Sequence, residues 1–222
     1  MRRRATARQR VSIVGILGEL FITAGILVLL FLVWQLWFND IVVGGEQQAV
    51  ALQLSEGWDR PVPTASASPE PGEPVDPGEP VVAVAPENAV SFATLYVPRF
   101  GADYVRPIAE GVGVRDVLNK IGFGHYPETQ MPGEVGNFAI AAHRETYGRG
   151  LEYVQPTGVG VLDPVPQAPG VTPTDRIITL TSCNPFWSTA ERIIAYGVYD
   201  SWYPRAGGPP AEIAPLVQAG GN

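Results

Sequence analysis

Residues 176–185 read Arg-Ile-Ile-Thr-Leu-Thr-Ser-Cys-Asn-Pro, and residues 192–197 read Arg-Ile-Ile-Ala-Tyr-Gly. In the first stretch, β-branched and apolar residues alternate between two faces, which predicts a strand that ends at Cys183. Pro185 stops that strand, and a polar turn leads into a second β-rich run that opens with Arg192. We therefore expect a thiol at a strand end, with an arginine returning to its neighbourhood.

Cys183 is the only cysteine of the 222-residue chain. It cannot form a disulfide within the chain, so it is a buried apolar side chain, an idle free thiol or a nucleophile. An idle thiol outside the cell risks oxidation and cross-linking. Because the N-terminal sequence predicts that this part of the chain is exported, we favour the nucleophile.

The N-terminus has the features of a membrane anchor. Residues 1–10 contain five arginines and no acidic residue, and a long apolar run follows from Val11 to Phe38. About 20 apolar residues cross the hydrocarbon core as a helix, so this run is long enough. Arginines stay on the cytoplasmic side, which predicts a single-pass protein of the plasma membrane with an extracytoplasmic domain.

A cleaved signal peptide is the alternative interpretation of this run. Its apolar region would be shorter and would close on small residues, whereas residues 35–39 read Gln-Leu-Trp-Phe-Asn. We therefore expect an uncleaved anchor. The formal net charge of −7 understates the acidity of the exported part, because the arginines are concentrated at the N-terminus. This charge distribution argues against nucleic acid as a partner.

A proline-rich segment follows the anchor. Residues 60–88 contain eight prolines, and residues 71–80 are nearly a doubled unit. Such a segment cannot bury enough apolar surface to fold, and proline holds it extended, so it predicts a stiff spacer. The chain therefore divides into five segments. They are a cytoplasmic basic N-terminus (1–10), a transmembrane anchor (11–38), a juxtamembrane segment with the proline-rich linker (39–89), a folded domain (90–202) and a disordered tail (203–222).

The folded part has β-type patterns and little helix. Four strands are expected, at residues 92–97, 137–142, 177–182 and 193–199, and apolar residues at helical spacing predict one short helix at 113–121. Turns rich in glycine and proline separate these elements. The pattern predicts an all-β barrel or sandwich.

The chain has two histidines, His125 in a turn-like context and His143 at the close of a strand. A strand-end histidine and a strand-end cysteine in one small domain can lie side by side, and such a pair attacks a carbonyl without a cofactor. Cys183, His143 and Arg192 would supply a thiolate, a proton donor and a positive charge for an oxyanion. One cysteine and two histidines in separate loops lack metal-ligand spacing, so we expect no metal and no cofactor.

These motifs resemble the sortase family of cysteine transpeptidases. The resemblance rests on Thr-Leu-Thr-Ser-Cys at 179–183, on Arg192 nine residues later, and on Ala142-His143-Arg144 upstream. Residues 131–144 and 161–166, the N-terminal anchor and the proline-rich spacer are most similar to the class E sortases of actinobacteria. The resemblance implies that residues 90–202 form a catalytic domain with a sortase-type β-barrel.

By this resemblance Cys183 is the nucleophile and His143 is the general acid that protonates the departing amine. Arg192 then positions the substrate carbonyl and stabilises the oxyanion. Three further residues near these positions are candidates for substrate binding: Tyr147, Thr181 and Ser182. Tyr147 is equally well explained as a packing aromatic.

The resemblance also implies a substrate and an acceptor. A sortase cleaves the Thr–Gly bond of an LAXTG- or LPXTG-like sorting signal at the C-terminus of a secreted surface protein. It passes the acyl group to an amine of the peptidoglycan precursor, which attaches the surface protein to the cell wall.

The chain departs from the family pattern in one place. Between the histidine loop and the Tyr-Val-Gln-Pro segment the family has further barrel strands, whereas here residues 146–150 lead directly into Leu151. Several strands' worth of chain is absent around Gly150–Leu151, so we expect an incomplete barrel with exposed edge strands. An inactive, sortase-like wall protein anchored to the membrane is therefore the alternative function.

Overall fold

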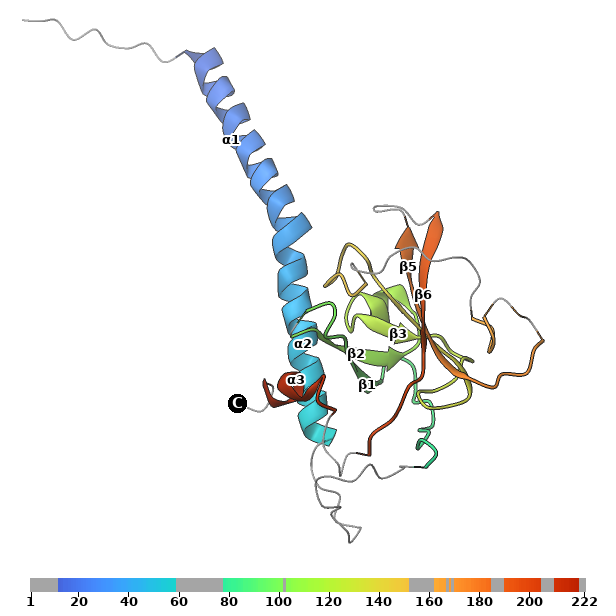
Figure 1. The fold of residues 1–222 in the computed structure, drawn as a ribbon. Helices are drawn as coiled ribbons and strands as arrows, with labels where there is room; N and C mark the ends of the chain where they lie inside the picture. The colour runs from blue at the N-terminus through green and yellow to red at the C-terminus, as the bar shows by residue number, and fades with distance from the viewer. Residues whose placement is uncertain are drawn as a thin grey trace, which may run out of the picture. The chain divides into compact units, whose positions relative to one another are not determined.

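The computed structural model describes residues 12–58, 78–101, 103–151, 162–166, 168, 170–184, 190–204 and 210–219. The chain divides into two compact units, residues 1–39 and 40–222. The first unit contains α1 (Ile13–Val33) and the π-helical turn η1 (Trp34–Phe38). The helix α2 (Asn39–Trp58) opens the second unit, which holds the sheet and the short helix α3 (Ala214–Ala219) (Figure 1).

α1 is the one helix in the described part of the chain that is long and apolar enough to cross a bilayer. It has 21 residues, and none of them is buried. At about 1.5 Å per residue such a helix is about 31 Å long, which matches a hydrocarbon core of about 30 Å. Ser12 caps its N-terminus by accepting a hydrogen bond from the Gly15 N–H (3.4 Å). The apolar run of the predicted anchor therefore folds as a helix of spanning length.

The second unit is built on one six-stranded mixed sheet whose strand order follows the chain. Antiparallel pairs join the first strand to the second, the third to the fourth and the fifth to the sixth, and parallel pairs join the remaining neighbours. The strands are β1 (Ser91–Tyr96), β2 (Val105–Glu110), β3 (Phe123–His125), β4 (Gly136–Ala142), β5 (Arg176–Asn184) and β6 (Glu191–Val198). The π-helical turn η2 (Val114–Leu118) connects β2 to β3.

The hydrophobic core lies against one face of this sheet. Its buried members come from β2, β3, β4, β6 and the loop after β4, namely Ile108, Phe123, Phe138, Ile140, Ala142, Leu151 and Ile193. All seven residues of β4 are buried, so β4 lies in the interior of the domain. Ile178 and Leu180 of β5 pack on the same core, as their alternation in the sequence predicts.

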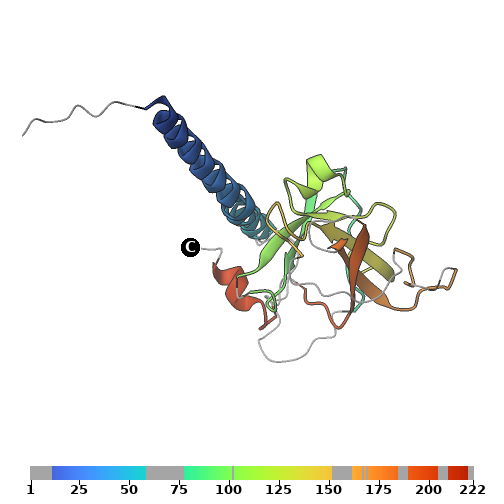
Figure 2. The same ribbon diagram turned by 90° about the horizontal axis from the view of Figure 1, so that it is seen from above.

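Within the described residues the sheet is open, with β1 and β6 as its two edges. Seen from above, the strands pass from green through olive to orange within one compact domain (Figure 2). Residues from both edge strands, including Leu95 of β1 and Val198 of β6, line one apolar cavity of about 260 Å³. The expected all-β fold with an incomplete, curled barrel is thus confirmed.

A short loop follows β4 at the point where the sequence predicts missing strands. After His143 the chain turns back, and the Leu151 N–H donates to the His143 carbonyl (3.1 Å). Leu151 is fully buried in the core, and the Tyr104 hydroxyl donates to the Gly150 carbonyl. The next residues, 152–161, which include the Tyr-Val-Gln-Pro segment, lie outside the described residues. The described loop therefore closes tightly without extra strands.

Three elements differ from the expectations. The predicted juxtamembrane segment forms the 20-residue α2, and residues 59–77, which include most of the proline-rich linker, lie outside the described residues. The tail expected to be disordered contains the six-residue α3. Pro215 lies in the first turn of α3, where its missing N–H and fixed φ are tolerated. His125, expected in a turn, lies in β3.

The sequence suggests a turn at His125 because of the neighbouring glycine, but that glycine has a steric role in the structure. Gly124 precedes it, and a Cβ at Gly124 would lie 2.2 Å from the Gly111 carbonyl oxygen. Glycine is therefore required by a close approach of two backbones in the sheet, and not by a turn.

Candidate active site

Neighbouring strands bring the candidate nucleophile and the candidate arginine together. β5 and β6 pair antiparallel in an unbroken register in which Cys183 lies directly opposite Arg192. Residues directly opposite each other on neighbouring strands project from the same face of a sheet. The two side chains therefore share one face at one end of the sheet.

His143 lies beside Cys183 on the other side of β5 from Arg192. β4 and β5 pair in parallel, with Ile140 opposite Leu180 and Ala141 opposite Thr181. Extending this register by two residues brings His143, the first residue after β4, level with Cys183. Three adjacent strands, β4, β5 and β6, thus present a histidine, a cysteine and an arginine side by side.

One cavity of about 430 Å³ joins these side chains. His143, Cys183 and Arg192 all line it, together with residues of η2, the β3–β4 connection, β4 and the histidine loop. Cys183 is partly exposed, so its sulfur is accessible from the cavity. The arrangement places a thiol, an imidazole and a guanidinium around a space large enough for a peptide segment.

Burial sets the ionisation of His143. Its Nε2–H donates to Oδ1 of Asn119 (2.8 Å), which fixes the orientation of the ring. Burial lowers the pKa of His143, and the carboxylates of Asp40 and Glu145 oppose that effect. The imidazolium therefore gives up its proton more readily than an exposed histidine would, which suits a general acid.

Of the three candidate substrate-binding residues, two line this cavity and the third packs on His143. Thr181 and Ser182 line it, but their hydroxyls are already engaged within the sheet: Thr181 with the Tyr126 hydroxyl (3.0 Å) and Ser182 with the Ala142 carbonyl (2.8 Å). The Tyr147 ring packs on His143, with ring centroids 5.2 Å apart. Tyr147 is 39% exposed, so its ring is accessible beside the imidazole.

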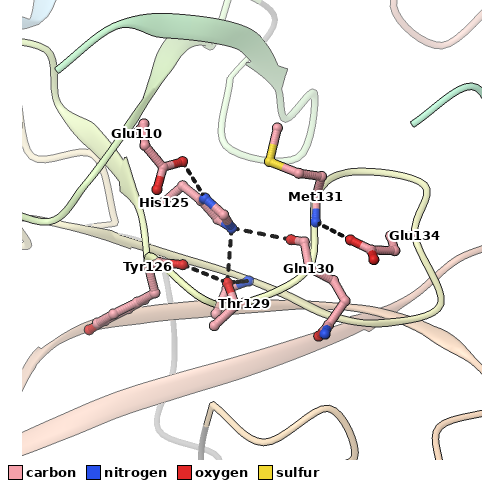
Figure 3. A network of polar contacts seen from close by, with 8 residues as sticks. Glu110, His125, Tyr126, Thr129, Gln130, Met131 and Glu134 are labelled. Carbon is pink, nitrogen blue, oxygen red and sulfur yellow. Dashed lines mark hydrogen bonds and ion pairs between the residues drawn. The ribbon is translucent and has the colours of Figure 1, made fainter. Parts of the chain in front are cut away.

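The second histidine belongs to a separate buried network (Figure 3). His125 is 1% exposed, and its Nδ1 contacts Oε2 of Glu110 (2.7 Å). Its Nε2 lies 2.9 Å from the Thr129 hydroxyl oxygen. The rings of Phe92 and Phe138 pack against the imidazole. His125 is therefore a buried polar residue away from the cysteine cavity.

We expect His125→Phe to destabilise the fold without removing the chemistry. The change leaves the Glu110 carboxylate without its partner on β3, and a buried charge left without a partner costs about 3 kcal/mol. Chemical denaturation of the full chain measures the loss in free energy of unfolding. Control variant Glu87→Gln, on an exposed residue, should leave it unchanged. A stability loss below about 1 kcal/mol would show that the network contributes little.

Sequence patterns did not identify two polar residues beside His143. Asn119 follows η2 with no motif around it, and Asp40 lies more than 100 positions upstream in the predicted juxtamembrane segment. No local spacing links either of them to the histidine, because the contacts arise only from the tertiary fold. Within the described ranges, no group of three or more His, Cys, Asp or Glu side chains is placed to hold a metal ion.

Comparison with known proteins identifies relatives that share this architecture. The sortase domain family matches residues 95–153. Sortase SrtE1 of Streptomyces coelicolor is 32% identical over 246 aligned residues, which cover 94% of this chain and 64% of the relative. The alignment is longer than this chain of 222 residues, so it includes residues of the relative that have no counterpart here. This chain therefore spans 64% of the length of that relative.

Two solved structures resemble the fold. The SrtA sortase from Actinomyces oris is 32% identical with a TM-score of 0.55, and the match covers 61% of this chain and 94% of that one. The crystal structure of sortase E1 from Streptomyces coelicolor with a tripeptide in its active site is 33% identical with a TM-score of 0.51 and covers 59% of this chain and 99% of that one. Identity above 30% across 94% and 99% of these two solved chains shows that the chain belongs to the sortase family of cysteine transpeptidases.

Proposed function

We propose that the chain is a membrane-anchored, class E-like sortase. In this proposal α1 crosses the plasma membrane with the N-terminus in the cytoplasm, and the sheet domain acts outside it. The enzyme cleaves the Thr–Gly bond of an LAXTG- or LPXTG-like sorting signal and attaches the surface protein to an amine of the cell wall. The observation that carries the proposal is the row of His143, Cys183 and Arg192 on three adjacent strands around one cavity.

The first half-reaction acylates the enzyme. The Cys183 thiolate attacks the carbonyl carbon of the substrate threonine, and a C–S bond forms while the carbonyl oxygen becomes an oxyanion. Arg192, directly opposite Cys183, offers its guanidinium to that oxyanion. When the intermediate collapses, the Thr–Gly C–N bond breaks, and His143 gives its proton to the departing glycine amine.

The second half-reaction transfers the acyl group. The acceptor amine loses a proton to His143 and attacks the thioester carbon, and the C–S bond breaks to release the thiolate. Because Asn119 holds Nε2 of His143, we assign the proton transfers to Nδ1. The same imidazole therefore serves as acid in the first half-reaction and as base in the second.

A peptide assay on the full chain in lipid nanodiscs tests the proposal. The chain is incubated with an LAXTG-like peptide and either triglycine or a diaminopimelate-type amine, and the products are identified by mass spectrometry. We expect a product in which the acceptor amine is joined to the threonine carbonyl. A well-folded chain that forms neither this product nor the hydrolysed peptide would favour the inactive, sortase-like wall protein instead.

We expect the ring of Tyr147, and not its hydroxyl, to matter for activity. Tyr147→Phe keeps the packing on His143, so kcat/KM should stay within about twofold of wild type. Tyr147→Ala removes the ring contact, and kcat/KM should fall about tenfold. Steady-state kinetics on both variants decide the question. Equal losses in the two variants would assign the role to the hydroxyl.

A further inference from the structure

One face of α2 packs against the domain. Its buried positions are Asp40, Gly44, Gln47 and Ala51, which are separated by four, three and four residues. That spacing places them in one stripe along a helix. One turn further, the Ser55 hydroxyl contacts the Tyr96 hydroxyl (2.6 Å). α2 is therefore docked along most of its length through small and polar side chains.

The loop that follows His143 has an unusual backbone. Tyr147, Gly148 and Arg149 have φ angles of 52°, 88° and 51°, so three successive residues adopt the left-handed region. This conformation is unfavourable for residues with a side chain and persists only where surrounding contacts hold it. The conformation of this loop therefore needs an external support.

α2 faces both the backbone N–H and the backbone carbonyl of Tyr147. Burial raises the pKa of the Asp40 carboxyl, and the backbone N–H groups of Tyr147 and Gly148, which face it, oppose that effect. The Gln47 side-chain amide donates to the Tyr147 carbonyl (3.0 Å). Both contacts come from the buried stripe of α2, so the helix binds the donor and the acceptor of one loop residue.

Close backbone contact completes the attachment. A Cβ at Gly148 would lie 3.1 Å from the Cα of Gly44 and 2.5 Å from Oε1 of Gln47. Glycine at 148 thus allows both the left-handed conformation and the approach of the helix. The loop is packed against α2 without an intervening side chain.

We propose that α2 is a positioning element for the loop that carries His143 and Tyr147, with Asp40 and Gln47 as its positioning residues. This inference rests on the proposed function, since it is the catalytic use of His143 that makes the loop important. It also means that the site depends on a helix outside the sheet that directly follows the first unit of the chain.

Electrostatics favour the same role for Asp40. The charged and titratable groups around His143 are Asp40 from α2, Glu145 and Tyr147 from its own loop, and Cys183 and Arg192 from the strands of the cavity. Arg149 of the same loop faces Asp40 and also interacts with its charge. The Asp40 carboxylate raises the pKa of His143 against the effect of burial. Removing this charge should therefore lower the pKa of His143 and reduce the fraction of imidazolium at neutral pH.

Two variants of the full chain in lipid nanodiscs test the proposal, each with a matched control on the exposed side of α2. Asp40→Asn removes the carboxylate charge, and Glu46→Gln is its control. Gln47→Met removes the side-chain hydrogen-bond donor at similar volume, and Gln53→Met is its control. The readouts are the His143 titration by NMR of 13C-labelled histidine, amide exchange at Tyr147 and Gly148, and peptide kinetics. The chain has only two histidines, so His125 serves as an internal reference.

We expect the His143 titration to move to lower pH in Asp40→Asn, and amide exchange in the loop to speed up at least about tenfold in both variants. kcat should fall about tenfold or more while KM changes less than about twofold, because the histidine is misplaced and the peptide still binds. Both controls should behave as wild type.

Titration and amide exchange that match the controls in both variants would overturn the proposal, whatever the activity. If the wild-type chain cleaves no peptide, the proposed function fails, and the titration and exchange data still decide whether α2 holds the loop. If Asp40→Asn does not fold, the exchange rates of Gln47→Met decide.

Discussion

We expect Cys183→Ala to abolish peptide cleavage and amine transfer, with a fall in rate of at least about 10⁴-fold. The reason is that no other thiol exists in the chain, and an enzyme that loses its nucleophile loses the covalent route entirely. Product formation from an LAXTG-like peptide, followed by mass spectrometry on the full chain in nanodiscs, measures the effect. The partial exposure of Cys183 predicts little change in the unfolding transition.

Alkylation provides a control that needs no substitution. Because the chain has one cysteine, iodoacetamide can modify one thiol only, and modification should inactivate the wild type. Alkylation of the Cys183→Ala variant should change nothing. A variant that still forms the transfer product at a rate near that of wild type would rule out Cys183 as the nucleophile.

We expect His143→Gln to lower kcat by about 10²- to 10⁴-fold, the usual contribution of a general acid–base. Glutamine keeps a polar side chain beside Asn119 but cannot release a proton. The pH profile should change as well. In the wild type, burial lowers the pKa of His143, so activity that depends on the imidazolium is lost as pH rises through that lowered value.

In the His143→Gln variant the residual activity should not show this loss at high pH, the alkaline limb of the profile. The profile of kcat against pH, recorded for both proteins on the same peptide, tests this directly. A variant with kcat within about threefold of wild type, or with the same alkaline limb, would assign the proton transfers to another group.

The candidate site lies on the best-paired part of the sheet. β4 and β5 share six register pairs, and β5 and β6 share eight. These three strands carry Cys183 and Arg192 and lead into His143. The loop after β4, in contrast, contains two backbone hydrogen bonds, from the Arg149 N–H to the Thr146 carbonyl and from the Leu151 N–H to the His143 carbonyl. The row of three side chains therefore does not depend on a closed barrel.

The strands that carry the site could be predicted from the sequence. β4, β5 and β6 have long β-branched or alternating runs, and their ends coincide with the histidine and the cysteine. β1 was predicted for the same reason. These elements have local patterns strong enough to specify strands without help from their neighbours.

Two strands and one helix face could not be predicted. β2 contains Pro107, which removes a ladder donor and argues against a strand. β3 has only three residues, with Gly124 at its centre. α2 buries Asp40, Gly44 and Gln47 where an amphipathic pattern would need apolar residues. In each case the tertiary contact, and not the local pattern, stabilises the element.

The most direct test of the central claim is to trap the acyl-enzyme. The full chain in nanodiscs is mixed with an LAXTG-like peptide without an acceptor amine, quenched in acid and analysed by intact mass and peptide mapping. We predict an adduct with the mass of the peptide up to its threonine, attached to Cys183 and released by hydroxylamine. Cleavage of the peptide with no adduct on Cys183, or with an adduct on another residue, would contradict the assignment of Cys183 as the nucleophile.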